Sequence, residues 1–83
     1  MNIDQIEKFL TSRHISGDTL RIDFRTRSST AGIFLKNSDY DDLKLKNFWR
    51  VVTGENIVDW KRTQNTNLSK IISGNEITKL SLI

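Results

Sequence analysis

Three residues near the end of the chain, Ser73-Gly74-Asn75, constrain its fold more than any other feature. They separate two apolar runs with the character of strands, "LSKII" at 68–72 and "EITKLSLI" at 76–83. A crossover between parallel strands needs about a dozen residues or more, so this connection is too short for one. It suits a turn or a single 3₁₀ turn between neighbouring strands. We therefore expect the last two strands to meet at a sharp corner.

The last strand carries apolar residues on both of its faces. Because side chains alternate along a strand, one face is expected to carry Thr78, Leu80 and Leu82. The other face is expected to carry Ile77, Lys79, Ser81 and Ile83. A strand of this kind promotes aggregation when it lies at a free edge. We expect it to be paired on both sides, as in a closed barrel, or covered by a helix or a second subunit.

The rest of the chain predicts one helix followed by strands. Apolar residues recur at helical spacing over about 3–12, and Asn2 with Gln5 can form a capping box at its start. The pattern then alternates in "TLRIDFR", which predicts a half-buried strand. Gly32 suggests a bulge or bend in the next strand. The predicted strands cover about 19–25, 30–36, 48–52, 68–72 and 76–82.

Two segments between these strands are less regular. The acidic stretch "NSDYDDLK" is expected to be a loop or a single helical turn. The stretch 57–61 fits either a strand, with Val58 and Trp60 on one side, or a short helix that begins at Asn56. Both alternatives stay open at this point.

Length and composition predict a single domain over 1–83, and the order of its elements predicts that this domain is a small barrel. With 83 residues, of which 36% are hydrophobic, the chain has enough apolar side chains for one modest core. It has no cysteine, so disulfides and thiolate metal sites are excluded. No run approaches the length of a signal peptide's apolar segment or a membrane span, so we expect a cytoplasmic protein without membrane contact. The predicted fold class is mainly β with one N-terminal helix, in a small, strongly bent five-stranded barrel.

The residues that catalysis requires are missing, so we expect neither an enzyme nor a bound cofactor or metal. The single histidine, His14, is expected at the helix end as a capping or surface side chain. No serine is spaced to pair with a base, and each glycine is isolated. Asp39, Asp41 and Asp42 lack the glycine and terminal glutamate of a calcium loop.

The predicted order of elements resembles the Sm and Sm-like family, in which an N-terminal helix lies on a bent five-stranded barrel, often assembled into rings. The first family motif is matched by Gly32 in the second strand and by acids followed by Asn47 in "DYDDLKLKNFW". The second motif is matched at Ile72, Gly74 and Ile77, with Ser73 where the family has arginine. The resemblance implies binding of single-stranded RNA, with Asn47, Ser73 and Gly74 at the motif positions.

Basic residues set beside aromatic ones support the same hypothesis. The net charge of +3 favours anionic partners, and "FWR" and "WKR" place flat and cationic side chains together. The candidate nucleic-acid contacts are Arg21, Arg25, Arg50, Lys61 and Arg62, with Trp49 or Trp60 stacking on bases. Phe48 and Trp49 point to opposite faces of their strand, so at least one is expected outside the core. The alternative function is a protein-interaction or self-assembly module that does not bind nucleic acid. It would bind a protein partner, or another copy of the chain in a homo-oligomer, through strand edges or exposed aromatic side chains.

Overall fold

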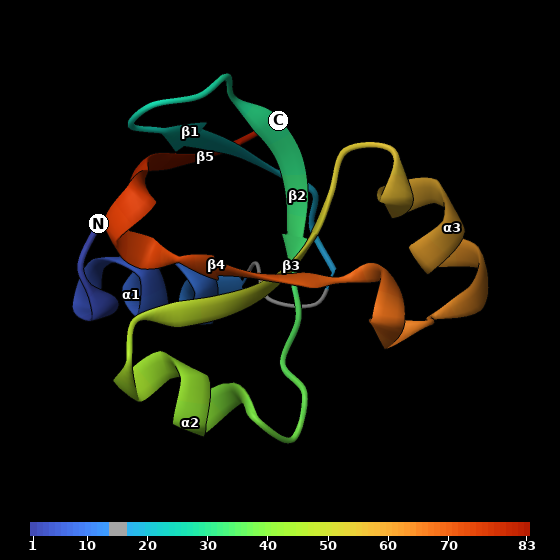
Figure 1. Ribbon diagram of the computed structural model, residues 1–83, viewed down its shortest axis with the longest axis horizontal. Helices are drawn as coiled ribbons and strands as arrows, with labels where there is room; N and C mark the ends of the chain where they lie inside the picture. Colours follow the sequence, from blue (N-terminus) through green and yellow to red (C-terminus); the bar gives the residue numbers. More distant parts are fainter. Residues whose placement is uncertain (14–16) are drawn as a thin grey trace.

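The computed structural model describes residues 1–13 and 17–83 and contains one five-stranded antiparallel sheet (Figure 1). The strands are β1 (Leu20–Phe24), β2 (Thr30–Phe34), β3 (Phe48–Thr53), β4 (Lys70–Ser73) and β5 (Ile77–Leu82). Their order in the sheet is β4-β3-β2-β1-β5, so the last strand lies beside the first. Each strand lies within two residues of its predicted range.

The predicted N-terminal helix is present as α1 (Ile3–Arg13). Its capping box is confirmed, because the backbone N–H of Asn2 donates to Gln5 Oε1 at 3.0 Å and the backbone N–H of Gln5 donates to Asn2 Oδ1 at 2.9 Å. The predicted position of His14, and of the helix end before Ser16, lies outside the described residues.

The expectation of a single helix is wrong, since two further helices interrupt the strand order. The acidic stretch forms α2 (Tyr40–Leu45), and the ambiguous stretch forms α3 (Asn56–Thr63). Ile57 and Trp60, three residues apart, are the buried residues of α3, whereas Val58 is 74% exposed. Helical spacing therefore decides which side chains of this stretch meet the sheet.

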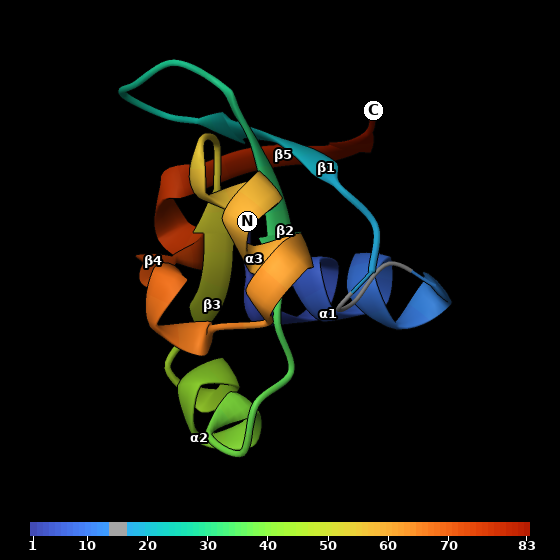
Figure 2. The same ribbon diagram turned by 90° about the vertical axis from the view of Figure 1, so that its right-hand side faces the viewer.

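The sheet is covered by different helices on its two faces (Figures 1 and 2). The main core packs α1 and Tyr40 of α2 against one face. A second cluster packs α3 against the other face of β2 and β3. The main core contains Ile6, Leu10, Leu20, Ile22, Phe34, Tyr40, Trp49, Val51, Ile72, Ile77 and Leu80, and the second cluster contains Ile33, Leu35, Val52, Ile57 and Trp60.

Gly32 serves close packing. It is the last residue of β2 that pairs with β1 and the first that pairs with β3, and neither pairing shifts its register, so the expected bulge is not seen. A Cβ atom at Gly32 would lie 2.6 Å from Ile22 Cδ1 and 3.0 Å from Val51 Cγ1. The irregularity of the sheet lies instead between β1 and β5, where the register shifts between Asp23 and Phe24.

This irregularity changes the expected faces of the last strand. Asp23 pairs with Lys79 and Phe24 pairs with Ile77, so Thr78 is the extra residue of a bulge. Ile77 and Leu80 are consequently both buried, although strict alternation would place them on opposite faces. Leu82 is 62% exposed, so the far end of the strand is uncovered.

The corner before β5 is the predicted 3₁₀ turn, η2 (Gly74–Glu76). Ser73 caps it, since its Oγ accepts a hydrogen bond from the backbone N–H of Asn75 at 3.3 Å. The turn does not close the sheet. Within the described residues β4 and β5 each pair with one strand only, β3 and β1 respectively, and they form the two edges.

Candidate functional site

The three motif positions Asn47, Ser73 and Gly74 lie together at the corner between β3, β4 and η2. The backbone N–H of Gly74 donates to the carbonyl of Asn47 at 2.7 Å. Asn47 has a left-handed backbone with φ of 59° and is 8% exposed. Asparagine adopts this conformation more readily than most residues, which explains its place after α2.

The side chain of Asn47 is fully engaged inside the protein. Its Oδ1 accepts from the indole N–H of Trp49 at 2.8 Å. Its Nδ2 donates to the carbonyl of Met1 at 3.0 Å and to Asn75 Oδ1 at 3.3 Å. The corner is therefore a partly buried polar network that holds the start of α1 against the sheet, and Asn47 has no free group for a base.

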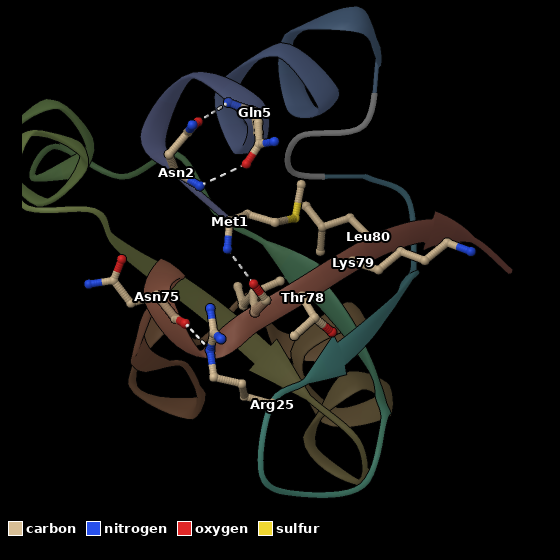
Figure 3. A pocket seen from close by; sticks show the side chains of 9 residues that line it. Met1, Asn2, Gln5, Arg25, Asn75, Thr78, Lys79 and Leu80 are labelled. Carbon is tan, nitrogen blue, oxygen red and sulfur yellow. Dashed lines mark hydrogen bonds between the residues drawn. The ribbon is translucent and has the colours of Figure 1, made fainter.

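An open hollow of about 570 Å³ adjoins this network, between the start of α1, the turn η2 and β5 (Figure 3). Its size is in the range of small-molecule sites, about 300–1,000 Å³. The residues that line it are Met1, Asn2, Gln5, Arg25, Asn75, Ile77, Thr78, Lys79 and Leu80.

Positive groups surround the hollow. The amino group of Met1 donates to the carbonyl of Gly74 at 2.9 Å and to the carbonyl of Ile77. Burial lowers the pKa of this amino group, and the nearby charge of Arg25 lowers it further. Arg25 itself is exposed, and its Nε donates to the carbonyl of Asn75 at 3.1 Å.

The predicted basic contacts do not gather on one face, because they come from three separate elements. Arg21 lies in β1 and Arg25 directly follows it, Arg50 lies in β3, and Lys61 and Arg62 lie in the last turn of α3. Lys61 is exposed. Only Arg25 among them lines the hollow.

Three of the five basic side chains already have acidic partners. Arg21 Nε lies 3.1 Å from Asp23 Oδ1, and Arg62 Nη2 lies 3.0 Å from Asp59 Oδ1. Both pairs are exposed, and such pairs are weak and easily exchanged.

Arg50 has a structural role instead of a binding one. It is less than a quarter exposed, and its Nη2 lies 2.6 Å from Asp39 Oδ2. The hydrogen bond from Arg50 holds the pKa of Asp39 below its usual value. The pair links β3 to the start of α2, so Asp39 acts as a structural ion-pair partner and Arg50 is withdrawn from the surface.

The expectation that a tryptophan stacks on bases needs correction, because both indoles are buried. Trp49 is 2% exposed and packs edge-on against Phe34 and Tyr40. Trp60 is 8% exposed beneath α3. Neither offers a free ring face. As expected from strand alternation, Phe48 is the exposed neighbour, at 39%.

The sheet edges carry much of the exposed apolar surface. Ile71 on β4 is 49% exposed, and Phe48, whose register partner is Ser73 of β4, is also uncovered. At the other edge Leu82 is exposed, and Ile83 follows it at 77%. Two further exposed apolar side chains, Leu45 and Val58, lie on helices.

Comparison with known proteins gives no match, whether with a family model, a curated protein or a solved structure. Among the described residues, no helix is both long and apolar enough to cross a membrane. The same residues contain no group of three or more histidine or acidic side chains placed to hold a metal ion.

Sequence reasoning missed the hollow and its cationic residue Lys79. The residues that line it are separated by more than 70 positions along the chain, as Met1 and Lys79 show. No local pattern marks such a site. The nearest signal was the motif position Gly74, next to Asn75 in the wall of the hollow.

Proposed function

We propose that this chain is a small non-catalytic binding module that assembles head to tail with copies of itself, with β4 of one chain paired to β5 of the next. The observation that supports this most directly is the open sheet. Both edge strands are unpaired on their outer sides among the described residues, and each carries exposed apolar side chains. Unpaired backbone groups beside apolar side chains are a template for strand addition.

The two edges are different surfaces, so the proposed contact is heterologous. Such contacts form rings when the rotation between subunits closes, and open filaments when it does not. The strand order β4-β3-β2-β1-β5 and the 3₁₀ corner support the further proposal of a strongly bent, Sm-like barrel whose β4 and β5 edges stay open for a neighbouring chain. Ring assembly is what that resemblance implies.

Mixed assembly of two edge variants tests the proposal. Light scattering across a concentration series should show an oligomer for the unmodified chain. Ile71→Lys at the β4 edge and Leu82→Lys at the β5 edge should each reduce it to a monomer, because a charged side chain on an edge strand disfavours pairing with another strand. An equimolar mixture should form a dimer, since each variant keeps the edge that the other lacks. Val58→Lys on α3 is the matched control and should assemble normally.

A monomer at every concentration of the unmodified chain would refute assembly through the edges. Equal assembly of both edge variants and the control would place the contact elsewhere. A circular dichroism spectrum that matches the unmodified chain is required of each variant before its mass is interpreted.

Single-stranded nucleic acid is a second candidate ligand. It is supported by the exposed positions of Arg21 on β1, of Arg25 just after β1 and of Lys79 on β5. Affinity for single-stranded RNA, measured by fluorescence anisotropy, should fall steeply with salt. Each phosphate contact contributes about 0.7 to the slope of log K against log salt. The double change of Arg21 and Arg25 to glutamine should lower that slope by about 1.4. An unchanged slope would remove both residues from the interface.

A further inference from the structure

The backbone hydrogen bonds of the sheet determine which residues of β4 point out of its free edge. In an antiparallel pair, residues whose N–H and C=O groups face the neighbouring strand alternate with residues whose groups face away from it. The N–H of Gly74 donates to the carbonyl of Asn47 at 2.7 Å, so Gly74 faces β3. Two positions earlier Ile72 also faces β3, and therefore Ile71 and Ser73 face outward.

The outward residues of β5 follow from its pairing with β1. The N–H of Arg25 donates to the carbonyl of Glu76 at 2.9 Å, so Arg25 faces β5. The residues two and four positions before it face the same way, and their register partners on β5 are Lys79 and Ser81. Lys79 and Ser81 therefore face β1. The outward residues, which alternate with them, are Leu80 and Leu82.

The two free edges match in length and in apolar character. The carbonyl of Ile77 already accepts a hydrogen bond from the amino group of Met1, so the free stretch of β5 lies beyond the bulge. From there each edge offers two outward residues, two positions apart in its strand. One outward residue on each edge has an exposed apolar side chain, Ile71 on β4 and Leu82 on β5.

We propose that β4 of one chain pairs antiparallel with β5 of the next, with Ile71 opposite the partner's Leu82 and Ser73 opposite the partner's Leu80. This register rests on the assembly proposed above and defines its contact. It is the one antiparallel register in which all four outward residues meet an outward residue of the other chain. Each of the two pairs then exchanges both of its backbone hydrogen bonds.

The side chains favour the same register. Opposite residues of an antiparallel pair have their side chains on one side of the sheet and in contact. Ile71 and the partner's Leu82 would therefore cover each other's apolar surface. Lys70 would lie opposite the partner's Ile83 and not opposite Lys79, so no like charges are opposed.

Disulfide formation can report this register, because the chain has no cysteine of its own. Opposite residues of an antiparallel pair have Cα atoms about 4.5–5.5 Å apart, within the range of about 4.4–6.8 Å that a disulfide spans. Four exposed positions serve as single-cysteine variants, two next to each other at each edge. They are Lys70→Cys and Ile71→Cys at the β4 edge, and Leu82→Cys and Ile83→Cys at the β5 edge.

Each β4 variant is mixed with each β5 variant under mild oxidation, and covalent dimers are measured on a non-reducing gel. Ile71→Cys with Leu82→Cys should cross-link, and so should Lys70→Cys with Ile83→Cys. The two crossed mixtures are the matched controls, because they contain the same four chains. They should give at least about tenfold less dimer, since their cysteines would lie on opposite faces of the joined sheet.

The other outcomes overturn the register in distinguishable ways. Cross-linking in the crossed mixtures alone would show a parallel contact, and a covalent dimer of Leu82→Cys by itself would show that like edges meet. An oligomer in which none of the four mixtures cross-links would reject this register and keep the assembly. A monomer of the unmodified chain at every concentration would refute both. The two matched pairs are independent, so if one variant fails to fold by circular dichroism the other pair decides.

Discussion

Replacing Gly74 by alanine tests whether the corner network holds the fold together. Gly74 lies outside the left-handed region, so its role is to leave space for Asn47. An added Cβ would lie 2.1 Å from Asn47 Oδ1 and 2.7 Å from Ile6 Cδ1. Carbon contacts in proteins are comfortable at about 3.5–4.0 Å, so Asn47 must shift by about 1 Å or more. That shift breaks its hydrogen bond with the Trp49 indole.

The expected cost combines two effects. Overpacking in a buried site costs about 1–3 kcal/mol, and a buried polar group left without a partner costs about another 1–3 kcal/mol. We therefore expect Gly74→Ala to lower the free energy of unfolding by about 2–6 kcal/mol. For a domain of this size each kcal/mol lowers Tm by about 4–8 °C, so the effect is large.

Urea denaturation followed by circular dichroism gives the measurement. Gly54→Ala is the control, because Gly54 has a φ of 52° but open space, with Thr30 Oγ1 3.6 Å from the added atom. Its cost should be only that of the left-handed backbone, about 1–2 kcal/mol. Asn47→Gly removes the clashing side chain, so the double variant with Gly74→Ala should cost less than the sum of the single changes. A loss below about 0.5 kcal/mol for Gly74→Ala, or strict additivity with Asn47→Gly, would refute this reasoning.

Two further predictions concern the ion pair and the tryptophans. Arg50 lowers the pKa of Asp39 in the folded protein, so the pair stabilises the fold at pH values above the ordinary pKa of an aspartate. This stabilisation is lost as the pH falls through the lowered pKa of Asp39 in the folded state. In Asp39→Asn, the urea concentration at the midpoint of unfolding should therefore fall less steeply with decreasing pH at acid pH. The same acid dependence in the variant and the unmodified chain would contradict this. Trp49→Phe should destabilise the protein by about 1–3 kcal/mol more than Trp60→Phe, because it orphans Asn47 Oδ1 whereas the buried Trp60 Nε1 has no partner to lose. Equal losses in urea denaturation would show that the Asn47–Trp49 bond contributes little.

Several elements could be predicted because their signals are local. The capping box requires only that Asn2 and Gln5 stand three residues apart, and β1 is marked by its alternation from Leu20 to Phe24. The 3₁₀ corner follows from the shortness of the link between two strands. The helix α3 remained ambiguous because "IVDWKRTQ" fits both periods, and only contact with the second cluster selects the face with Ile57 and Trp60.

The features that bear on function depend on residues far apart in the chain. The faces of β5 depend on a bulge opposite β1, which lets Ile77 and Leu80 share the core. The burial of both tryptophans depends on how α2 and α3 pack on the sheet. Arg50 is held away from the surface by Asp39, which lies just before α2. Sequence alone determined where the chain forms a helix and strands, since hydrogen bonding and side-chain alternation act between near neighbours. Only the tertiary structure decided which charges stay free and which side chains are buried, because pairing and burial depend on the packing of both chain ends against one sheet.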